Sequence, residues 1–386
     1  MELQCLASYR RKLLRGTFLL FFVGLFLCSC NKTEKEINDL YSSGVVLVQN
    51  SGYYELKIDD ELSVYFSNYS DEGELENFTF DKDSIVVTTS YGTGFFVSEF
   101  GEIVTNHHVV ASTVLEKEAS KSLKKMFKAV KEECLVEYNE YNSLMTELLN
   151  ITAKYERNYS ATGYISENDY NTYQNAHNYV KMCKEKIEYC ELLYTLIDNI
   201  DMSDAELKYK NKVSIAYNDE YITSATDFVP CVVKKTDEKN DLAIIQLSSK
   251  KTPEDKAIFE ILDENPMETS SLFYPGKNDK LIMIGFNLGP ALALTENGVL
   301  SQCTSGMITQ ERDNCYMYSI PSLHGSSGAP VVNQKGELVA INFAGLDFTQ
   351  NFNYGIKVDF LRRLYSNYLV LGLSFLMYIE IIPHFQ

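Results

Sequence analysis

Apolar residues follow two different periods along the chain, and the change of period divides it into segments. Between residues 44 and 110, short apolar and β-branched runs alternate with Gly, Asn, Asp and Ser, which is typical of β-strands joined by turns. The same pattern returns after about residue 209 and ends in "VDFLRRLYSNYL", which predicts a closing helix. Many short strands of this kind predict a mainly β protein, built as a sandwich or a barrel. The predicted strands are "GVVLVQ", "SIVVTT", "TGFFVS", "EIVTNHHVV", "KVSIAYN", "FVPCVVKKT", "LAIIQLS", "KLIMIGF", "GVLSQCTSGMI", "CYMYSI", "APVVN" and "ELVAINFA".

A helical pattern interrupts the strands. From residue 113 to about 159 the apolar positions recur at steps of three and four, which predicts a helix with a coiled-coil-like seam. After the break "SATGYIS", a second helical run covers residues 170–197. Thr113 and Ser166, each followed three residues later by an acidic residue, are predicted to cap the two helices. Two long helices with a short break predict an antiparallel α-helical hairpin inserted into the β fold.

The first residues form a separate segment. Four basic residues precede an apolar run over residues 18–27, which predicts a secretory signal too short to span a membrane comfortably. The end of the run, "LCSC", resembles the lipobox of bacterial lipoproteins, in which a lipid is attached to the last cysteine. The resemblance implies that residues 1–29 are removed and that Cys30 carries a lipid. An ordinary signal peptide or an uncleaved anchor is the alternative. The polar residues 30–40 are expected to be a tether.

The lipobox resemblance also implies a location. The protein is expected to be exported and held in the cell envelope by its N-terminal lipid, facing the periplasm or the cell surface. The net charge of −18 disfavours binding to nucleic acid and a polybasic membrane patch. Nothing in the sequence suggests a cofactor.

Export bears on the cysteines, because exported proteins can form disulfides. Nine cysteines are present, and sequence alone does not decide how they pair. Folding the hairpin about residue 162 places Cys134 opposite Cys190, so a disulfide between them is one prediction. Two apolar seam residues are the alternative. The sequence contains no CxxC motif and no Cys/His cluster, so no metal site is predicted.

The stretch "HGSSGAP" at residues 324–330 raises the question of a nucleophilic serine. A hydroxyl attacks a carbonyl only if a base removes its proton, an acid orients that base, and backbone N–H groups stabilise the oxyanion. Glycines on both sides of the serines allow the backbone to bend so that such donors converge. Taken alone, the stretch is a weak signal for catalysis, because Gly/Ser turns between strands are common.

Candidates for the base and the acid occur earlier in the chain. Of the five histidines, one lies in the helical segment, one beside the serines and one near the end. His107 and His108 remain, where an apolar strand ends in a polar turn; a surface pair is the alternative. Asp241 precedes the apolar strand "LAIIQLS" and could reach an imidazole, although an aspartate before a strand is also common in turns.

Four segments together resemble the trypsin-fold serine peptidases, and among them the bacterial HtrA/Deg-like branch. They are "GTGFFV" (92–97), "TNHHVV" (105–110), "NDLAII" (240–245) and "GSSGAP" (325–330). Their order is His, Asp, Ser, whereas α/β-hydrolases have Ser, Asp, His.

The resemblance implies a fold and its boundaries. Residues 41–111 and 209–365 are expected to form a double six-stranded β-barrel, which the helical hairpin at 112–208 interrupts. The residues 366–386 are expected to be an apolar tail that packs on the barrel or on a partner. No PDZ domain is expected after the peptidase.

The resemblance also assigns roles to single residues. His108 is implied to be the base and Asp241 the orienting acid. His107 fills a variable position and, in an extended strand, should point elsewhere. Ser327 is implied to be the nucleophile, with Ser326 at the variable position. Digestive members carry at that position an aspartate that pairs with a new N-terminus, so this zymogen switch is not expected here.

The remaining expectations concern binding. By the same resemblance, the N–H groups of Gly325 and Ser327 form the oxyanion hole. The segments on either side of the nucleophile imply a substrate pocket for small or medium apolar side chains; its lining is expected to include Pro321, His324, Ile341 and Phe343. His324 is also reminiscent of glutamyl endopeptidases, in which a histidine helps to bind acidic side chains. A plain surface residue is the alternative.

The leading functional hypothesis is a serine endopeptidase that acts on proteins or peptides without a metal or a cofactor. The alternative from a different class is a catalytically idle peptidase fold that serves as a surface scaffold through its helical hairpin. An esterase on the same fold is a third possibility. The hairpin, residues 113–200, is expected to bind a partner, restrict access to the cleft or mediate oligomers. A passive stalk is the alternative.

Overall fold

The chain is described by a computed structural model over residues 31–70, 72–224, 227–261, 275–276, 279–345 and 353–381. The predicted signal peptide and Cys30 lie outside these residues. Contacts divide the described chain into two units. The barrel unit holds the residues up to Ser51, Thr89–Ala111 and the residues from Asn211 onward, and the hairpin unit holds Gly52–Thr88 and Ser112–Lys210.

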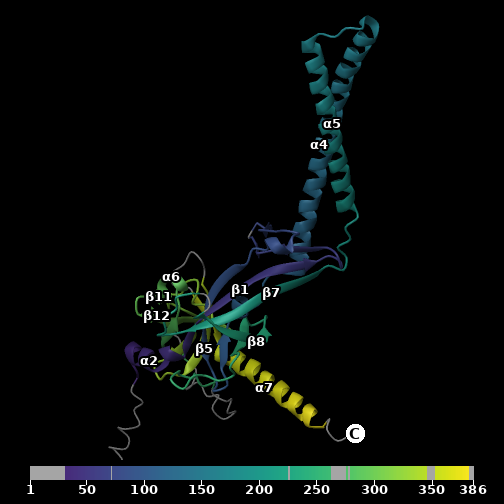
Figure 1. The fold of residues 1–386 in the computed structure, drawn as a ribbon. Coiled ribbons are helices and arrows are strands. Elements are labelled where there is room, and N and C mark those ends of the chain that lie inside the picture. The colour runs from purple at the N-terminus through teal and green to yellow at the C-terminus, as the bar shows by residue number, and fades with distance from the viewer. Residues whose placement is uncertain are drawn as a thin grey trace, which may run out of the picture. The chain divides into compact units, whose positions relative to one another are not determined.

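Six strands close the first barrel of the barrel unit, and Figure 1 labels β1, β5, β7 and β8 among them. Their order around the barrel is β1-β5-β6-β9-β8-β7, and a pairing between β1 and β7 completes the ring. The strands are β1 (Val45–Lys57), β5 (Thr88–Phe96), β6 (Glu102–Thr105), β7 (Glu206–Tyr217), β8 (Val229–Asp237) and β9 (Leu242–Leu247). Along the chain, β1 ends and β7 begins within the hairpin unit.

The second barrel is also closed by six strands, in the order β10-β13-β14-β17-β16-β15. They are β10 (Lys280–Gly285), β13 (Gln302–Glu311), β14 (Cys315–Tyr318), β15 (Pro330–Asn333), β16 (Leu338–Gly345) and β17 (Asn353–Lys357). Between β10 and β13 the chain forms a short helix and a small hairpin, which are α6 (Pro290–Ala293), β11 (Leu294–Thr295) and β12 (Gly298–Val299). The predicted double six-stranded barrel is therefore confirmed.

One apolar cluster joins the two barrels. Phe95 and Ile244 come from the first barrel, and Ile282, Phe286 and Ile341 come from the second; each of them is at most 1% exposed. Because this core is continuous, the loops at the junction of the barrels are supported from both sides.

Two strand predictions are wrong in part. Of "SIVVTT", only the final threonines enter β5, because Asp81 caps a 3-10 turn (Lys82–Ser84) just before it. The run "EIVTNHHVV" leaves the strand at Thr105 and continues as the short helix α3 (His107–Val110). Strand β17 was not among the predicted strands.

The predicted tether over residues 30–40 is also wrong. Residues 34–41 form helix α2 (Glu34–Tyr41), which Thr33 and Glu36 begin with a reciprocal capping box. The side chain of Ile37 is fully buried in the core, and Glu34 forms an ion pair with Lys280 at 2.7 Å. The segment is folded because one apolar residue and a capped N-terminus tie it to the barrel unit.

Helix α7 (Val358–Ile381) confirms the predicted closing helix and extends it. Leu361 and Leu364 are buried, and the Tyr365 hydroxyl donates a hydrogen bond to the buried carboxylate of Glu102 at 2.5 Å. Among the helices in the described ranges, none is long and apolar enough to cross a bilayer. The contacts expected for the tail stay a prediction.

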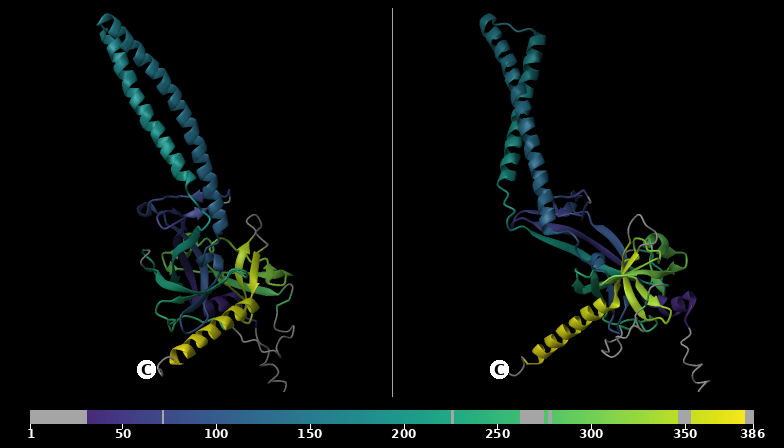
Figure 2. Two further views of the ribbon diagram at one scale, coloured as in Figure 1. Left: turned by 90° about the vertical axis from the view of Figure 1, so that its right-hand side faces the viewer. Right: turned by 180° about the vertical axis from the view of Figure 1, so that it is seen from behind.

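The hairpin unit consists mainly of two helices that run alongside each other, α4 (Glu116–Thr162) and α5 (Glu167–Asp198), as both views of Figure 2 show. Gly163 ends α4 in a left-handed conformation. Ser166 caps α5 as predicted, since its side chain accepts a hydrogen bond from the Asp169 N–H. The cap predicted at Thr113 is wrong, because α4 begins after Leu115 without a side-chain cap.

The start of α4 and the residues that follow α5 pack on strands. Tyr54 and Phe66 stack on each other and belong to one buried cluster with Leu123, Phe127 and Met202. The strands of this unit are the second half of β1, the first residues of β7, and β2 (Ser63–Phe66), β3 (Asn68–Tyr69) and β4 (Leu75–Glu76). The hairpin boundaries are close to those expected, but residues 52–88 cluster with the hairpin and not with the first barrel, because their apolar face is buried there.

Cys134 and Cys190 line the same cavity between α4 and α5 and are both buried. The structure describes them as free thiols, so the predicted disulfide is absent and the alternative of buried seam residues holds. Burial, followed by the nearby carboxylate of Glu137, raises the pKa of both thiols. Protonated thiols are poor nucleophiles for disulfide exchange.

Candidate active site

Strand pairing brings His108 and Asp241 together although 133 residues separate them. In the β6–β9 pair, Thr105 lies opposite Ala243. His108 follows β6, and Asp241 immediately precedes β9, so both lie at the same end of the pair. Asp241 has a φ of 50°, a left-handed conformation that Asp tolerates better than most residues.

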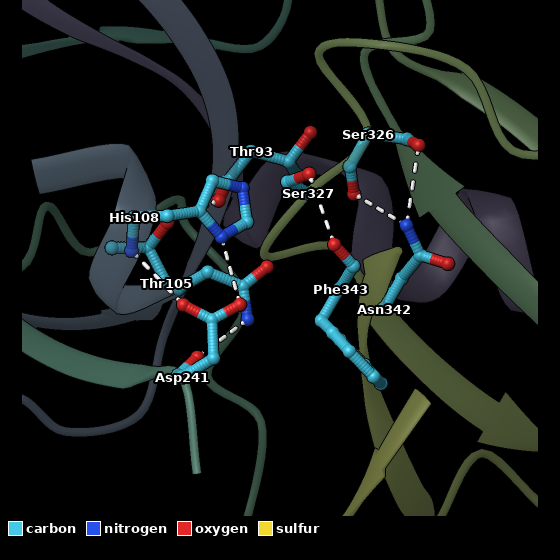
Figure 3. Close-up of polar contacts among 9 residues, drawn as sticks. Thr93, Thr105, His108, Asp241, Ser326, Ser327, Asn342 and Phe343 are labelled. Carbon is cyan, nitrogen blue, oxygen red and sulfur yellow. Dashed lines mark hydrogen bonds and ion pairs between the residues drawn. The ribbon is translucent and has the colours of Figure 1, made fainter. Parts of the chain in front are cut away.

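Asp241 holds His108 at two points (Figure 3). Its Oδ2 lies 2.7 Å from His108 Nδ1, and its Oδ1 accepts a hydrogen bond from the His108 backbone N–H at 2.9 Å. Asn106 supports the acid by donating its side-chain N–H to the Asp241 carbonyl at 2.8 Å. A carboxylate at Nδ1 keeps the proton on that nitrogen and leaves Nε2 as the basic one.

His107 takes no part in the His108–Asp241 pair, and the prediction that it lies in an extended strand is wrong. The two histidines lie in the helical turn α3, where successive side chains point about 100° apart, and not in an extended strand. Both ring nitrogens of His107 are buried without a hydrogen-bond partner among the described residues.

The two neighbouring serines are in different environments. Ser326 is fully buried; its hydroxyl lies 2.8 Å from Ser322 Oγ and donates to the Leu323 carbonyl at 2.6 Å. Asn342 also donates to Ser326, through its side-chain amide. Ser327 is only partly buried, so of the two hydroxyls only that of Ser327 is available to a substrate.

The Ser327 hydroxyl lies beside the His108–Asp241 pair but is not bonded to it. It donates to the Phe343 carbonyl at 3.4 Å, a long and weak bond. A Cβ atom added at Gly92 would touch both Val109 and the Ser327 carbonyl, so the residue next to His108 and the Ser327 backbone meet at one position. In Figure 3 the His108 ring lies between Asp241 and Ser327. Catalytic hydrogen bonds are often long before substrate binds.

The turn around Ser327 leaves two backbone donors unengaged. Gly325 and Gly328 have φ values of 95° and 90°, which only glycine adopts readily. A Cβ atom at Gly328 would overlap the Thr93 carbonyl. Within the described ranges, the N–H groups of Gly325 and Ser327 donate no hydrogen bond. Two such amides on one turn are suited to a developing oxyanion.

Thr93 supports the turn that carries Ser327, and the sequence pattern did not indicate this. Its hydroxyl donates to the Gly325 carbonyl at 2.7 Å and accepts from the Phe286 N–H at 3.0 Å. Its own N–H donates to the Ser327 carbonyl at 2.8 Å. Thr93 therefore ties the first barrel to both ends of the oxyanion turn. The only sequence signal was its place within "GTGFFV".

Replacing Thr93 by valine is expected to slow turnover and reduce stability. Valine has nearly the same shape but leaves the buried Gly325 carbonyl and Phe286 N–H without a partner, which costs about 2–4 kcal/mol in unfolding free energy. Loosening the turn should lower kcat/KM by about a hundredfold. Thr93→Ser keeps the hydroxyl and is the matched control. Urea unfolding and peptide hydrolysis measure the two effects; a valine variant that behaves like the serine variant would contradict the assignment.

The residues predicted to line the substrate pocket are only partly brought together. Pro321 and His324 are exposed, and Phe343 is partly buried. Ile341 does not line a pocket: it is fully buried in the core, because it pairs on both sides, with Pro330 and with Ile356.

Behind the nucleophile turn lies a buried hydrogen-bond network that the sequence analysis also missed. The Tyr318 hydroxyl donates to Asn342 Oδ1 at 2.7 Å, and the Asn342 amide donates to Ser322 and Ser326. Burial raises the pKa of Tyr318 well above its ordinary value, so the hydroxyl stays protonated and can donate. Among the described residues, no group of three or more His, Cys, Asp or Glu is placed to hold a metal ion.

Comparisons with known proteins give two family matches. A trypsin-like peptidase domain matches residues 201–341, which include Asp241 and Ser327, and Peptidase S46 matches residues 68–192, which include His108. No curated protein matches the chain. Among solved structures, a serine endoprotease from Yersinia pestis is similar, with 12% identity and a TM-score of 0.42 over 88% of this chain and 68% of that chain.

The family matches support a serine peptidase with a trypsin-like fold, in agreement with the resemblance of the four sequence motifs. The HtrA/Deg-like branch and the lipid anchor stay predictions.

Proposed function

We propose that this protein, whose residues 201–341 match the trypsin-like peptidase domain, is a serine endopeptidase that cleaves peptide bonds through an acyl-enzyme on Ser327. The observation that carries the proposal is the His108–Asp241 pair at 2.7 Å, next to an accessible serine on a turn with two unengaged N–H groups. Each group has the role that acyl transfer requires.

The proposed reaction begins when Ser327 Oγ attacks the scissile carbonyl carbon and His108 Nε2 takes the hydroxyl proton. The Gly325 and Ser327 N–H groups then stabilise the negative carbonyl oxygen. His108 returns the proton to the leaving amine as the C–N bond breaks. Water attacks the resulting ester by the same route and releases Ser327. Asp241 stays ionised throughout and stabilises the imidazolium.

One adjustment must precede the attack. The Ser327 hydroxyl donates to the Phe343 carbonyl, so it has to rotate towards His108. The rotation is a change of the Ser327 side chain from one staggered position to another. A substrate N–H group that donates a hydrogen bond to the Phe343 carbonyl would displace the Ser327 hydroxyl from it as the substrate binds.

An extended peptide is the substrate class that fits the surroundings. β15 pairs with β16 only as far as Ile341, and Gly328 and Ala329 engage Asn342. From Phe343 onward this edge of β16 is free of strand pairing in the described part of the chain. An unpaired edge next to a nucleophile can bind a peptide backbone by strand addition, which an isolated ester would not exploit. This supports a protein or peptide substrate over an esterase function.

A fluorophosphonate probe tests the proposal. The probe should form an adduct on the Ser327 hydroxyl in the wild type, and mass spectrometry of the digested protein would locate it. A folded wild type that is not labelled would favour the alternative, an idle peptidase fold used as a scaffold.

We also propose that the hairpin is a partner surface. Several of its apolar side chains are at least half exposed: Val136, Tyr159, Tyr164, Tyr170, Tyr179, Tyr189, Leu192 and Leu196. Isolated exposed apolar residues are common, but this density along two helices is typical of a binding surface.

Shortening the hairpin tests this. Replacing residues 139–185 by a short glycine-rich loop keeps the buried cluster around Leu123, Phe127 and Met202 and removes the distal half. The variant is expected to fold, and to lose partner binding or self-association or to change cleavage of large substrates. Peptide cleavage is the internal control. Unchanged association, partner capture and protein cleavage would leave only a passive stalk.

We propose, further, that the protein is an exported lipoprotein anchored through Cys30. Support comes from the sequence "LCSC". Helix α2 begins only four residues later, so the barrel unit would be held close to the membrane. Mass spectrometry of the mature N-terminus decides the matter: an unmodified N-terminus at another residue would refute the anchor.

A further inference from the structure

Four leucines on the loop between β10 and β13 and on the nucleophile loop are exposed to solvent. Leu288, Leu292, Leu294 and Leu323 have exposed fractions of 45, 50, 49 and 52%. Full burial of a leucine side chain stabilises by about 1.5–3 kcal/mol, so each of these half-exposed leucines forgoes roughly half of that. A group of them from two separate segments points to a surface that is covered when something binds.

Two hydrogen bonds tie these segments to the nucleophile turn. The Leu288 N–H donates to the His324 carbonyl at 2.6 Å, and the Leu323 N–H donates to Asn287 Oδ1 at 2.9 Å. A Cβ atom added at Gly325 would overlap the Phe286 carbonyl. The leucines of both segments therefore flank the oxyanion turn directly.

The backbone at Leu288 is strained. Its φ is 58°, a left-handed conformation that a branched side chain seldom adopts. Such strain is concentrated at functional sites. Here the conformation directs the N–H towards His324 and leaves the leucine side chain half exposed.

The leucines lie on one particular flank of the turn. Ser327, Gly328 and Ala329 engage the Phe343 and Asn342 segment, whereas Gly325 abuts residues 286–289. If the peptide residues on one side of the scissile bond pair with the edge of β16, the residues on the other side of that bond must lie over the opposite flank of the turn. That flank is the one that carries Leu288 and Leu323.

We propose that Leu288 and Leu323 form an apolar subsite for the side chain that follows the scissile bond. This inference rests on the proposed peptidase function. It assigns a substrate class, peptides with an apolar residue immediately after the cut. A leucine bound there should gain about tenfold over glycine, because burying apolar surface on this scale is worth somewhat more than 1 kcal/mol.

Partitioning of the acyl-enzyme tests the subsite separately from the chemistry. N-acetylalanine 4-nitrophenyl ester acylates the enzyme, and leucinamide or glycinamide then competes with water for the acyl group. Capture by the amide gives acetylalanylleucinamide or acetylalanylglycinamide, and hydrolysis gives acetylalanine. Their ratio depends only on the second half of the reaction and is independent of how much active enzyme is present.

Leucinamide is expected to capture the acyl group about tenfold more efficiently than glycinamide in the wild type. Leu288→Asn should reduce that preference to about threefold or less, because asparagine tolerates a positive φ but offers little apolar surface. Leu369→Asn, at a leucine that is 46% exposed on α7, is the matched control and should keep the full preference.

The outcomes separate two failures. Equal capture of leucinamide and glycinamide by the wild type would overturn the subsite and leave the peptidase intact. A Leu288→Asn variant with the full preference would do the same. Absence of any acyl-enzyme in the folded wild type would overturn the proposed function and the subsite together.

Discussion

Ser327→Ala is expected to lower kcat/KM for peptide hydrolysis by about a millionfold, since removal of the nucleophile ends acyl-enzyme formation and leaves only binding and oxyanion stabilisation. The variant should fold normally, because within the described residues the Ser327 hydroxyl makes a single, long hydrogen bond, at 3.4 Å to Phe343. Continuous hydrolysis of a fluorogenic peptide measures the loss, and the fluorophosphonate adduct should disappear with it.

Ser326→Ala is the control for this prediction. Its buried hydroxyl bonds to Ser322, Leu323 and Asn342, so its removal should reduce the unfolding free energy by about 1–3 kcal/mol. Fluorophosphonate labelling of Ser327 and most of the peptide hydrolysis activity should remain in this variant. The opposite pattern, with labelling lost in Ser326→Ala and kept in Ser327→Ala, would show that the nucleophile has been misassigned.

Asp241→Asn is expected to lower kcat by about ten-thousandfold, by analogy with the loss of the orienting acid in other Ser-His-Asp enzymes. The side-chain amide cannot both accept from His108 Nδ1–H and stabilise the imidazolium charge. An amide NH2 facing Nδ1 would instead favour the tautomer with its proton on Nε2, which cannot accept the serine proton. Asparagine tolerates the φ of 50° at this position, so the fold should be retained.

Asp237→Asn is the matched control for Asp241. Asp237 lies four residues earlier, and its carboxylate bonds to Asn240 instead of a histidine. The kcat of Asp237→Asn should stay within about threefold of the wild-type value. Such a difference corresponds to well under about 1 kcal/mol in activation free energy, which is usual for a surface substitution. A loss of less than tenfold in Asp241→Asn would mean that Asp241 does not orient the base.

The structure differs from the sequence predictions mainly where contacts distant in sequence decide the outcome. Residues 30–40 were expected to be a tether from their polar composition, yet one buried side chain, Ile37, and a capping box are enough to fold helix α2 onto the barrel unit. Ile341 was expected in a pocket because it is apolar and near the site. Its neighbours on both sides, β15 and β17, place it in the core.

Positioning residues were the hardest to predict. Thr93 and Asn342 have no chemistry of their own in an acyl transfer, so no motif logic identifies them as functional. Thr93 bonds to Gly325, 232 residues away, and Asn342 bonds to Ser326 from a neighbouring strand. Their roles follow from the closure of two barrels.

The sequence by itself determined the classes of the segments and the candidate chemistry. Hydrophobic period distinguishes strands from the inserted helices, because each secondary structure repeats its buried face at its own interval. The motifs around His108, Asp241 and Ser327 gave the candidates for the reactive residues, since such groups need particular neighbours in the chain.

Only the tertiary structure decided how those groups meet. The register of β6 against β9 brings His108 to Asp241, and burial separates Ser326 from Ser327. It also decided that Leu288 and Leu323 lie on one flank of the turn. These facts depend on pairings between residues far apart in the chain, and a local pattern of polar and apolar residues does not encode which distant partner a strand edge will meet.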